Sequence, residues 1–149
     1  MDFYERLSDF LLNQLELKSA FPNDSNEGFI TFEPISNNER GIAILDAPST
    51  TNQRYFDRSR VYDWSVQVVV KNIDQQQAFS DAMSIYQECD DLPRPKKDGL
   101  LTIISSNDSF ELLSASGYTM PRMIEKTVHN AYVYSFLLKF DLFINAKKG

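Results

Sequence analysis

Apolar and polar residues alternate most regularly near the end of the chain. Within residues 130–145 every second residue is apolar, from Tyr132 through Phe136 and Phe140 to Ile144. Because successive side chains of a strand point to opposite faces, this spacing predicts one long strand with a buried face. The other face mixes small, charged and apolar residues, which suits a surface partly covered by another element or another subunit.

A second alternating run predicts another long strand over residues 60–71. One face of this run carries Tyr62, Trp64 and three valines. Two strands of this length indicate an extended sheet. No catalytic motif accompanies them, so the function must be sought in how the sheet is used.

Helical spacing of apolar residues occurs first near the N-terminus. Phe3, Leu7 and Leu11 belong to a series that recurs at helical intervals up to residue 17. Asp2, just before this series, and Glu5, three residues later, have the spacing of a capping box, in which both side chains bond to free amides of the first turn. The chain is therefore expected to open with an amphipathic helix.

A second helix is predicted after residue 73, with Asp74 and Gln77 as its cap pair. Two prolines in residues 92–99 remove amide donors and end it. The residues expected on its inner face are Ala78, Phe79, Ala82, Met83, Tyr86 and Cys89.

Short β-prone runs account for much of the remainder. Residues 28–32 and 41–45, separated by turn-forming residues, are expected to form a hairpin. Residues 100–105 and 110–114 predict two further strands, residues 117–127 fit no element clearly, and residues 47–59 are expected to be a loop. This order predicts an α+β fold with two helices packed on one face of a mainly antiparallel sheet.

The length of 149 residues fits one domain, residues 1–149, with a core of ordinary size. No run approaches the roughly 20 apolar residues of a membrane span, and the first residues lack the basic region of a secretory signal. We therefore expect a soluble protein that is made and stays in a cytoplasm, without a membrane partner.

The formal net charge of -6 is distributed unevenly, because residues 1–46 hold nine acidic residues against three basic ones. Nucleic-acid binding needs clustered Lys and Arg to contact phosphates. The acidic N-terminal third thus argues against nonspecific DNA binding by that part, and we expect no sequence-specific nucleic-acid partner.

The usual catalytic and metal-binding patterns are missing from the sequence. The five glycines are scattered, and His129 is the one histidine, without a nucleophile motif elsewhere. Asp90 and Asp91 are expected to form a solvated helix end rather than a metal site, and Cys89 is expected to act as a small buried apolar residue. We expect no enzyme activity, cofactor or metal.

Two basic clusters remain as candidate contact sites. Arg94, Lys96 and Lys97 favour a solvated loop over a binding surface. The second cluster interleaves basic and aromatic side chains, and a role in partner contact is as plausible for it as solvent exposure, since exposed aromatic rings are costly without use. Its members are Arg54, Tyr55, Phe56, Arg58 and Arg60.

The order and spacing of four segments resemble the tail terminator proteins of long-tailed phages with non-contractile tails, a group also labelled minor capsid proteins. The first segment, Gly-Ile-Ala-Ile-Leu-Asp-Ala-Pro at residues 41–48, is similar to the family's short strand before a long loop. The others are similar to its next strand, the helix that follows and its last strand. These are residues 66–71, 78–86 and 134–141.

The resemblance implies a structural virion protein without catalysis. Its subunits would form a homo-oligomeric ring, a hexamer by family analogy, that caps the tail tube, ends tube polymerisation and joins the tail to the head connector or stopper protein. It would lie at the head-tail junction after assembly in the host cytoplasm. We expect the loop of residues 47–59, with Lys147 and Lys148, to contact the tube or the connector.

Other functions remain open on the sequence alone. Another head-completion or connector protein, or a tail tube subunit, could share an α+β core and also form rings. From different classes, a small enzyme would need a polar pocket with perturbed titratable groups. A nucleic-acid-binding module would be retained on heparin or DNA at moderate salt.

Overall fold

The two long strands predicted from alternation form the centre of the main sheet. The computed structural model describes residues 2–22, 28–47, 50–54 and 60–144. Strands β5 (Arg60–Asn72) and β9 (Tyr132–Ile144) pair antiparallel along their whole length. Val66, Val68 and Val70 of β5 are fully buried. On the same face of β9 the middle residues are buried, namely Phe136, Leu138, Phe140 and Leu142. Both strand predictions are confirmed.

The sheet is completed on both sides of this pair, and all its pairings are antiparallel. The strand order is β3-β5-β9-β8, with β4 also paired to β5. Because β9 takes the other side of β5 throughout, β3 and β4 share one edge: β3 pairs with the second half of β5, and β4 with its beginning. The added strands are β3 (Arg40–Asp46), β4 (Thr50–Arg54) and β8 (Glu111–Lys126).

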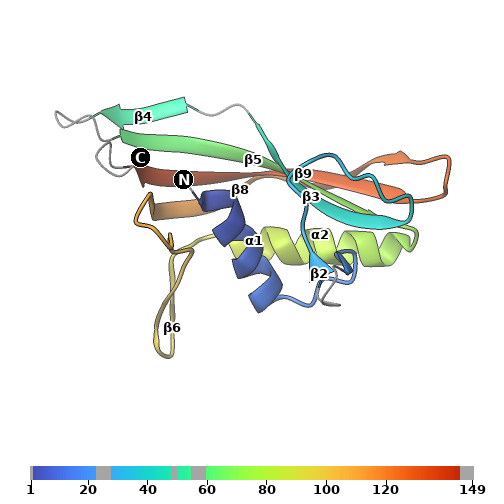
Figure 1. Ribbon diagram of the computed structural model, residues 1–149, viewed down its shortest axis with the longest axis horizontal. Helices are drawn as coiled ribbons and strands as arrows, with labels where there is room; N and C mark the ends of the chain where they lie inside the picture. Colours follow the sequence, from blue (N-terminus) through green and yellow to red (C-terminus); the bar gives the residue numbers. More distant parts are fainter. Residues whose placement is uncertain (1, 23–27, 48–49, 55–59, 145–149) are drawn as a thin grey trace.

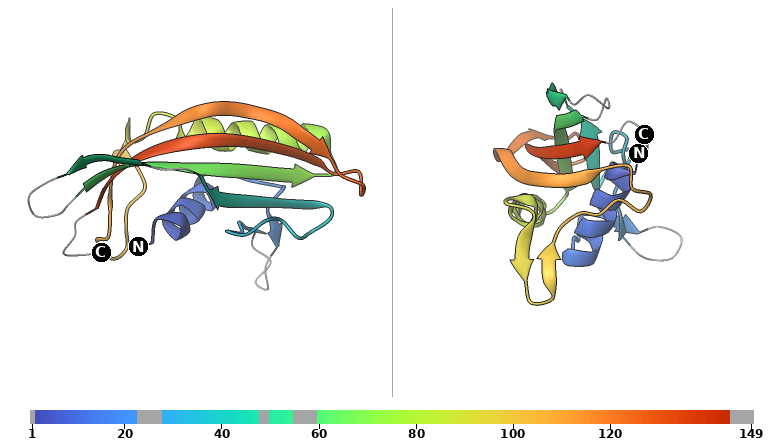
Figure 2. Two further views of the ribbon diagram at one scale, coloured as in Figure 1. Left: turned by 90° about the horizontal axis from the view of Figure 1, so that it is seen from above. Right: turned by 90° about the vertical axis from the view of Figure 1, so that its left-hand side faces the viewer.

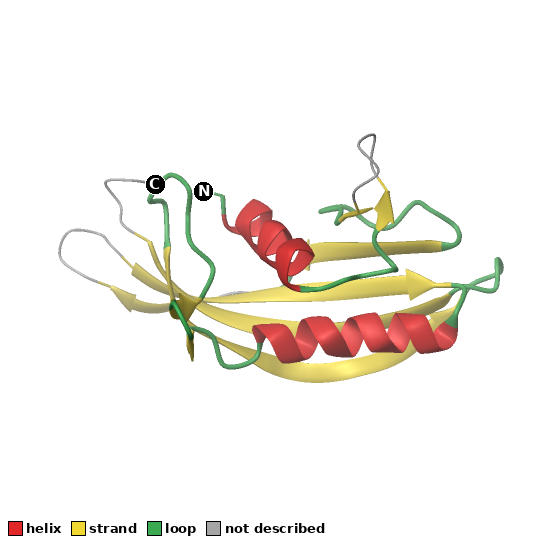
Figure 3. Cartoon of the chain, turned by 90° about the horizontal axis from the view of Figure 1, so that it is seen from below, coloured by secondary structure: helices red, strands yellow, loops and turns green. Residues whose placement is uncertain are grey.

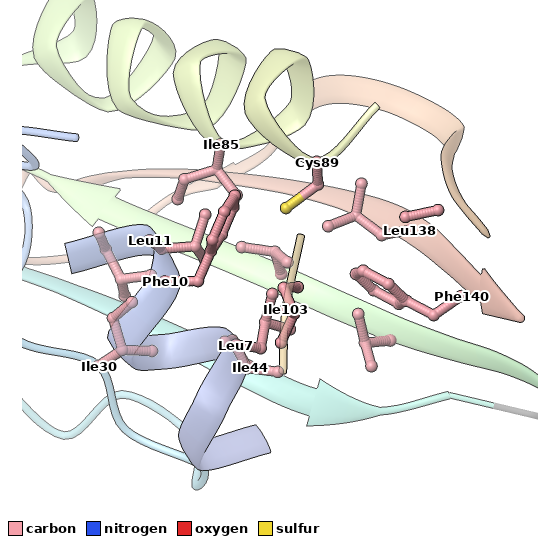
Figure 4. Close-up of a cluster of buried hydrophobic side chains, with 14 of the residues drawn as sticks. Leu7, Phe10, Leu11, Ile30, Ile44, Ile85, Cys89, Ile103, Leu138 and Phe140 are labelled. Carbon is pink, nitrogen blue, oxygen red and sulfur yellow. The ribbon is translucent and has the colours of Figure 1, made fainter. Parts of the chain in front are cut away.

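Both helices lie on the same face of this sheet, as Figures 1 and 3 show. They are α1 (Phe3–Gln14) and α2 (Gln75–Cys89). The core fills the space between helices and sheet, with α1 contributing Leu7 and Leu11, α2 contributing Ile85, and β9 contributing Phe140 (Figure 4). The predicted α+β class and the placement of both helices on one face are confirmed.

The two helices begin differently. In α2 the Asp74 carboxylate accepts hydrogen bonds from the backbone N of Gln76 (3.0 Å) and of Gln77 (3.3 Å), so Asp74 is confirmed as the cap. Its predicted pairing with Gln77 is wrong, because the Gln77 side chain donates to Asp81. In α1 the predicted capping box is wrong, because the Asp2 side chain makes no cap hydrogen bond. Its carboxylate instead accepts hydrogen bonds from serines near residue 106.

The inner face of α2 is narrower than the spacing predicted. Ala78, Ala82, Ile85 and Cys89 are completely buried. The prediction that Phe79 belongs to this buried face is wrong, because Phe79 is 46% exposed; its ring centroid lies 5.7 Å from that of Tyr134.

The hairpin expected from residues 28–32 and 41–45 does not form. Strand β2 (Gly28–Phe29) pairs with β1 (Phe21–Pro22), and β3 pairs with β5 over seven residue pairs. Between the two predicted runs there is one parallel bridge, from Thr31 to Ala43. The long apolar strand β5 offers β3 a more extensive partner than residues 28–32 could.

Two further expectations are wrong, and one is confirmed and extended. The segment expected to be a loop contains β4, since residues 50–54 pair with β5. Of residues 100–105 only the first two are in a strand: β6 (Arg94–Lys96) and β7 (Gly99–Leu101) form a hairpin that projects away from the sheet (Figures 1 and 2). The strand expected over residues 110–114 is confirmed from Glu111 onward, and it continues through the unclear segment as the single long strand β8.

Buried polar groups fasten the segment after α1 to the rest of the fold. The carboxylate of Asp81, 2% exposed, accepts hydrogen bonds from the backbone N of Ser19 (2.7 Å) and from the Gln77 side chain (2.8 Å). The Asn72 amide donates to Ser19 Oγ (3.1 Å). The end of β5, the start of α2 and residues 17–20 are thereby held together.

Candidate assembly surface

The sheet face opposite the helices is not covered by any helix of the described chain. A groove of about 610 Å³ crosses it, lined by residues of β5, β8 and β9 and, at one end, by Asp46 of β3 and Ala47. At its floor the Gln67 amide donates to Ser135 Oγ (2.9 Å), and Thr119, Arg122 and Ile124 of β8 line one side. Neighbouring positions on this face carry an ion pair between Lys139 and Asp63 (3.2 Å). The face is polar with apolar patches, as its mixed sequence pattern predicted.

Strand β8 forms one edge of the sheet, and the first half of this edge is covered by the chain itself. Ala115 N donates to Leu92 O (2.8 Å), and Ala115 O accepts from Asp91 N (2.9 Å). Glu111 forms a bridge with Ile104. At these two positions, Ala115 and Glu111, the outward edge of β8 is therefore occupied by the chain itself.

Gly117 marks the end of the covered half. Its backbone N donates to the carboxylate of Asp90 (3.1 Å), the residue that ends α2. A Cβ at this position would overlap the ring of Tyr86, which packs across Phe136 with ring centroids 6.0 Å apart. Only glycine therefore lets α2 approach β8 this closely.

From Tyr118 onward the edge of β8 has no strand partner in the described part of the chain. Four large apolar side chains of this half are between 47% and 61% exposed. Apolar groups exposed close together in this way are typical of interaction surfaces. Tyr118 lies beside Lys139, whose Nζ is 4.7 Å from its ring centroid. The four are Tyr118, Met120, Met123 and Ile124.

Two of the predicted contact residues, Arg54 and Arg60, lie elsewhere, where β4 and β9 end and β5 begins. Arg54 is opposite Arg60 in the β4–β5 pairing, and Arg60 is opposite Ile144 in the β5–β9 pairing. The structure therefore brings Arg54, Arg60 and the end of β9 to one end of the sheet. The other predicted contact residues lie outside the described residues, namely Tyr55, Phe56, Arg58, Lys147 and Lys148.

The first basic cluster is divided by the structure. Arg94 is held by its own chain, donating to the backbone oxygens of Glu88 (3.0 Å) and Asp90 (3.1 Å) and pairing with the Glu88 carboxylate (3.1 Å). Lys96 and Lys97 are exposed at the tip of the β6–β7 hairpin. The cluster does not form one continuous basic surface.

The groups with clearly shifted pKa values are held in structural contacts. Burial and a hydrogen bond to Asp46 raise the pKa of Tyr4 to about 12. Burial, followed by the nearby Glu88 carboxylate, raises the pKa of the Cys89 thiol. Neither group opens into the groove on the helix-free face.

The described residues hold neither a metal-ligand cluster nor a membrane-spanning helix. Within the ranges described, no three His, Cys, Asp or Glu side chains come together as metal ligands. Neither described helix combines the length and apolarity needed to cross a bilayer.

Sequence reasoning missed the exposed half of β8. Its apolar residues do not alternate, because the pairing with β9 shifts register between Gly117 and Thr119, again before Arg122, and again after Met123. The usable signal was composition, since Tyr118, Met120, Met123 and Ile124 fall within seven residues around Pro121. Proline within a strand indicates an edge.

The comparisons with known proteins identify the family. The sequence profile described as "Bacteriophage tail terminator protein" matches residues 13–144, which include all five strands of the main sheet. Among solved structures, a chain from the virion of a native gene transfer agent particle is similar, with a TM-score of 0.45, 11% sequence identity and 76% of each chain covered. Comparison with curated protein sequences gives no match. Because the profile spans nearly the whole chain, the protein belongs to the bacteriophage tail terminator family.

Proposed function

We propose that this structural protein of a phage tail forms a closed homo-oligomeric ring at the head-tail junction. The ring caps the tail tube, ends tube polymerisation and joins the tail to the head connector or stopper protein. Its action is mechanical and involves no catalysis. The observation that carries this proposal is the family match over residues 13–144.

The shape of the sheet supports a role in assembly. Its helix-free face and half of the β8 edge leave apolar side chains and strand backbone exposed within the described chain. Exposed strand edges invite pairing with other chains, so soluble proteins cover or block them. A neighbouring subunit that covers such an edge would protect it from other chains and would also form the subunit interface of a ring.

The direct test combines the purified protein with its phage's tail tube protein. We expect the purified protein alone to sediment as a single species with the mass of one closed ring. When added to polymerising tube protein it should shorten the tubes in proportion to its concentration, with one ring at a tube end in electron micrographs. Tube lengths that stay unchanged would contradict termination. Long cylinders formed by the protein alone would instead indicate a tube subunit.

The end of the sheet that holds Arg54 and Arg60 is the proposed contact with the tube or connector, together with Lys147 and Lys148. Its support is the register that places the ends of β4, β5 and β9 beside each other. We expect Arg54→Ala with Tyr55→Ala to leave ring formation intact and to weaken head-tail joining in an assembly assay. Unchanged joining would remove this assignment.

A further inference from the structure

We infer that the exposed half of β8, residues 118–126, docks against the β3 edge of a second copy of this chain. The inference rests on the proposed ring and specifies the contact that builds it. We call the first surface the β8 edge, and the second the β3 flank, which comprises β3 and residues 31–39 beside it. Strands β8 and β3 belong to the same sheet and lie at its two opposite edges (Figures 1 and 2).

The two surfaces have matching strand directions. β3, β5, β9 and β8 are successive antiparallel neighbours, so β3 and β8 run in opposite directions. A second copy in the same orientation, placed beside the first, therefore brings its β3 antiparallel to β8. The contact uses two different surfaces, and repeating it with a constant rotation closes a ring.

The charges of the two surfaces are complementary. The β8 edge carries Arg122 and Lys126 against one acidic residue, Glu125. Residues 31–46 of the β3 flank carry Glu33 and Glu39, both exposed, against the partly buried Arg40. Asp46 at the end of β3 accepts from the Tyr4 hydroxyl, and Lys71 of β5 donates to Asn37 O (3.2 Å) at the other end of the flank. Opposite charges at a contact favour the correct partner and orient it. Two β8 edges facing each other would place like charges together.

Both surfaces also expose apolar side chains. The β8 edge offers Tyr118, Met120 and Ile124. On the β3 flank Phe32 is 42% exposed, and its ring lies 6.0 Å from that of Tyr4. A contact with apolar groups inside and charges around them is the usual composition of a subunit interface.

The contact is made by side chains rather than by a continuous ladder of backbone hydrogen bonds. On the β3 side, Thr31 already occupies the edge: its N donates to Ile42 O (3.0 Å) and its O accepts from Ile44 N (2.9 Å). On the β8 side, Pro121 lacks an amide hydrogen and the register shifts interrupt the strand. These features oppose pairing with an arbitrary strand and leave side-chain recognition to select the partner.

The experiment exchanges the charges of the two surfaces. The first variant carries Arg122→Glu and Lys126→Glu, and the second carries Glu33→Lys and Glu39→Lys. A control, Lys96→Glu with Lys97→Glu, makes the same change of charge as the first variant on the exposed β6–β7 hairpin. Thermal unfolding of each protein shows that it remains folded, and light scattering after gel filtration gives its assembly state.

We expect each variant alone to dissociate, with a subunit affinity reduced roughly tenfold or more by like charges at the contact. The control should form the same ring as the parent protein. A mixture of the two variants should assemble again, because the reversed β8 edge then meets the reversed β3 flank, and the two unchanged surfaces meet each other. A single chain with all four substitutions should also assemble.

Other outcomes overturn the inference in distinguishable ways. Rings formed by both variants alone would exclude this contact while leaving the proposed ring intact. Dissociated variants that fail to assemble when mixed would show that the two surfaces do not meet. Intact rings that no longer shorten tubes would assign the β8 edge to the tube protein. A parent protein that forms no ring would refute the proposed function itself.

Discussion

The Asp2 carboxylate accepts two hydrogen bonds from Ser106, one from its backbone N (2.8 Å) and one from its Oγ (2.6 Å). Ser105 Oγ (2.8 Å) and Ser109 Oγ (3.0 Å) donate to the other carboxylate oxygen. The start of α1 is thereby fixed to the turn that precedes β8. Although burial opposes ionisation, the bonds from Ser106, Ser105 and Ser109 outweigh it and hold the pKa of Asp2 well below its ordinary value of 3.8.

This arrangement predicts a specific loss of stability in acid. A carboxyl group whose pKa is lowered by folding stabilises the folded state above its unfolded pKa, and this contribution is lost as the pH falls toward the folded pKa. Asp2→Asn should lower the free energy of unfolding at pH 7 by about 2 kcal/mol. Below the ordinary value of 3.8 the difference from the parent should shrink. Urea unfolding at pH 7 and pH 3 measures both, and an equal difference at the two pH values would contradict the assignment.

The hydroxyl of Tyr4 links α1 to the sheet. It donates to the Asp46 carboxylate and accepts from Trp64 Nε1 (3.1 Å). Tyr4→Phe should destabilise the fold by about 1 kcal/mol, because both partners lose a hydrogen bond. It should also shift the emission of Trp64, the chain's single tryptophan. Tyr62→Phe is the matched control, since its ring packs 6.1 Å from the same indole; equal spectral shifts in both variants would refute the link.

The close approach of α2 to β8 predicts a coupled pair. Gly117→Ala places a methyl group where the Tyr86 ring lies, and should cost about 2 kcal/mol through displacement of that ring. Replacing Tyr86 by Leu in the same chain removes the overlapping ring atoms. The double variant should therefore lose less stability than the sum of the two single variants, as a thermal double-mutant cycle measures. Simple additivity would show that the ring does not restrict this position.

The buried Asp81 predicts a difference between two substitutions. Asp81→Ala leaves the buried backbone N of Ser19 without its acceptor, which should cost about 2 to 3 kcal/mol. Asp81→Asn keeps an oxygen at this place and should cost less. Denaturant unfolding of the two variants gives the comparison, and equal losses would mean that the negative charge, rather than the acceptor, matters.

The sequence predicted secondary structure best where an element buries one face along its whole length. Strand β5 pairs with β3, β4 and β9, and β9 pairs with β5 and β8. Each of the two strands has one face against the core, so their alternation is unbroken. The cap of α2 was equally predictable, because Asp74 bonds amides two and three residues away. Local rules hold where the partners are local.

The errors share a physical cause, which is competition from distant segments. Asp2 has the spacing of a capping residue, but serines more than 100 residues later take its carboxylate. Residues 28–32 and 41–45 have hairpin spacing, but β5 takes β3. In β8 the register shifts bring Tyr118 and Thr119, adjacent in sequence, to the same helix-free side. None of these contacts leaves a local pattern.

The candidate site was predicted only in part. The contact role of the cluster around Arg54 and Arg60 stays a prediction, made because basic and aromatic residues adjoin in sequence; the structure places these two arginines opposite each other. The β8 edge and the β3 flank were not found, because each becomes a surface only when the four strands are ordered across the sheet.

The position of Cys89 has a practical consequence for mapping such surfaces. It is the only thiol of the chain and is completely buried at the end of α2, where burial keeps it protonated and out of reach of alkylating reagents. A maleimide dye should therefore react with the native protein only at a cysteine introduced by design. Crosslinks and distance labels can therefore be placed at single introduced cysteines without first replacing Cys89. The rate at which Cys89 itself is slowly modified would measure how often the fold opens.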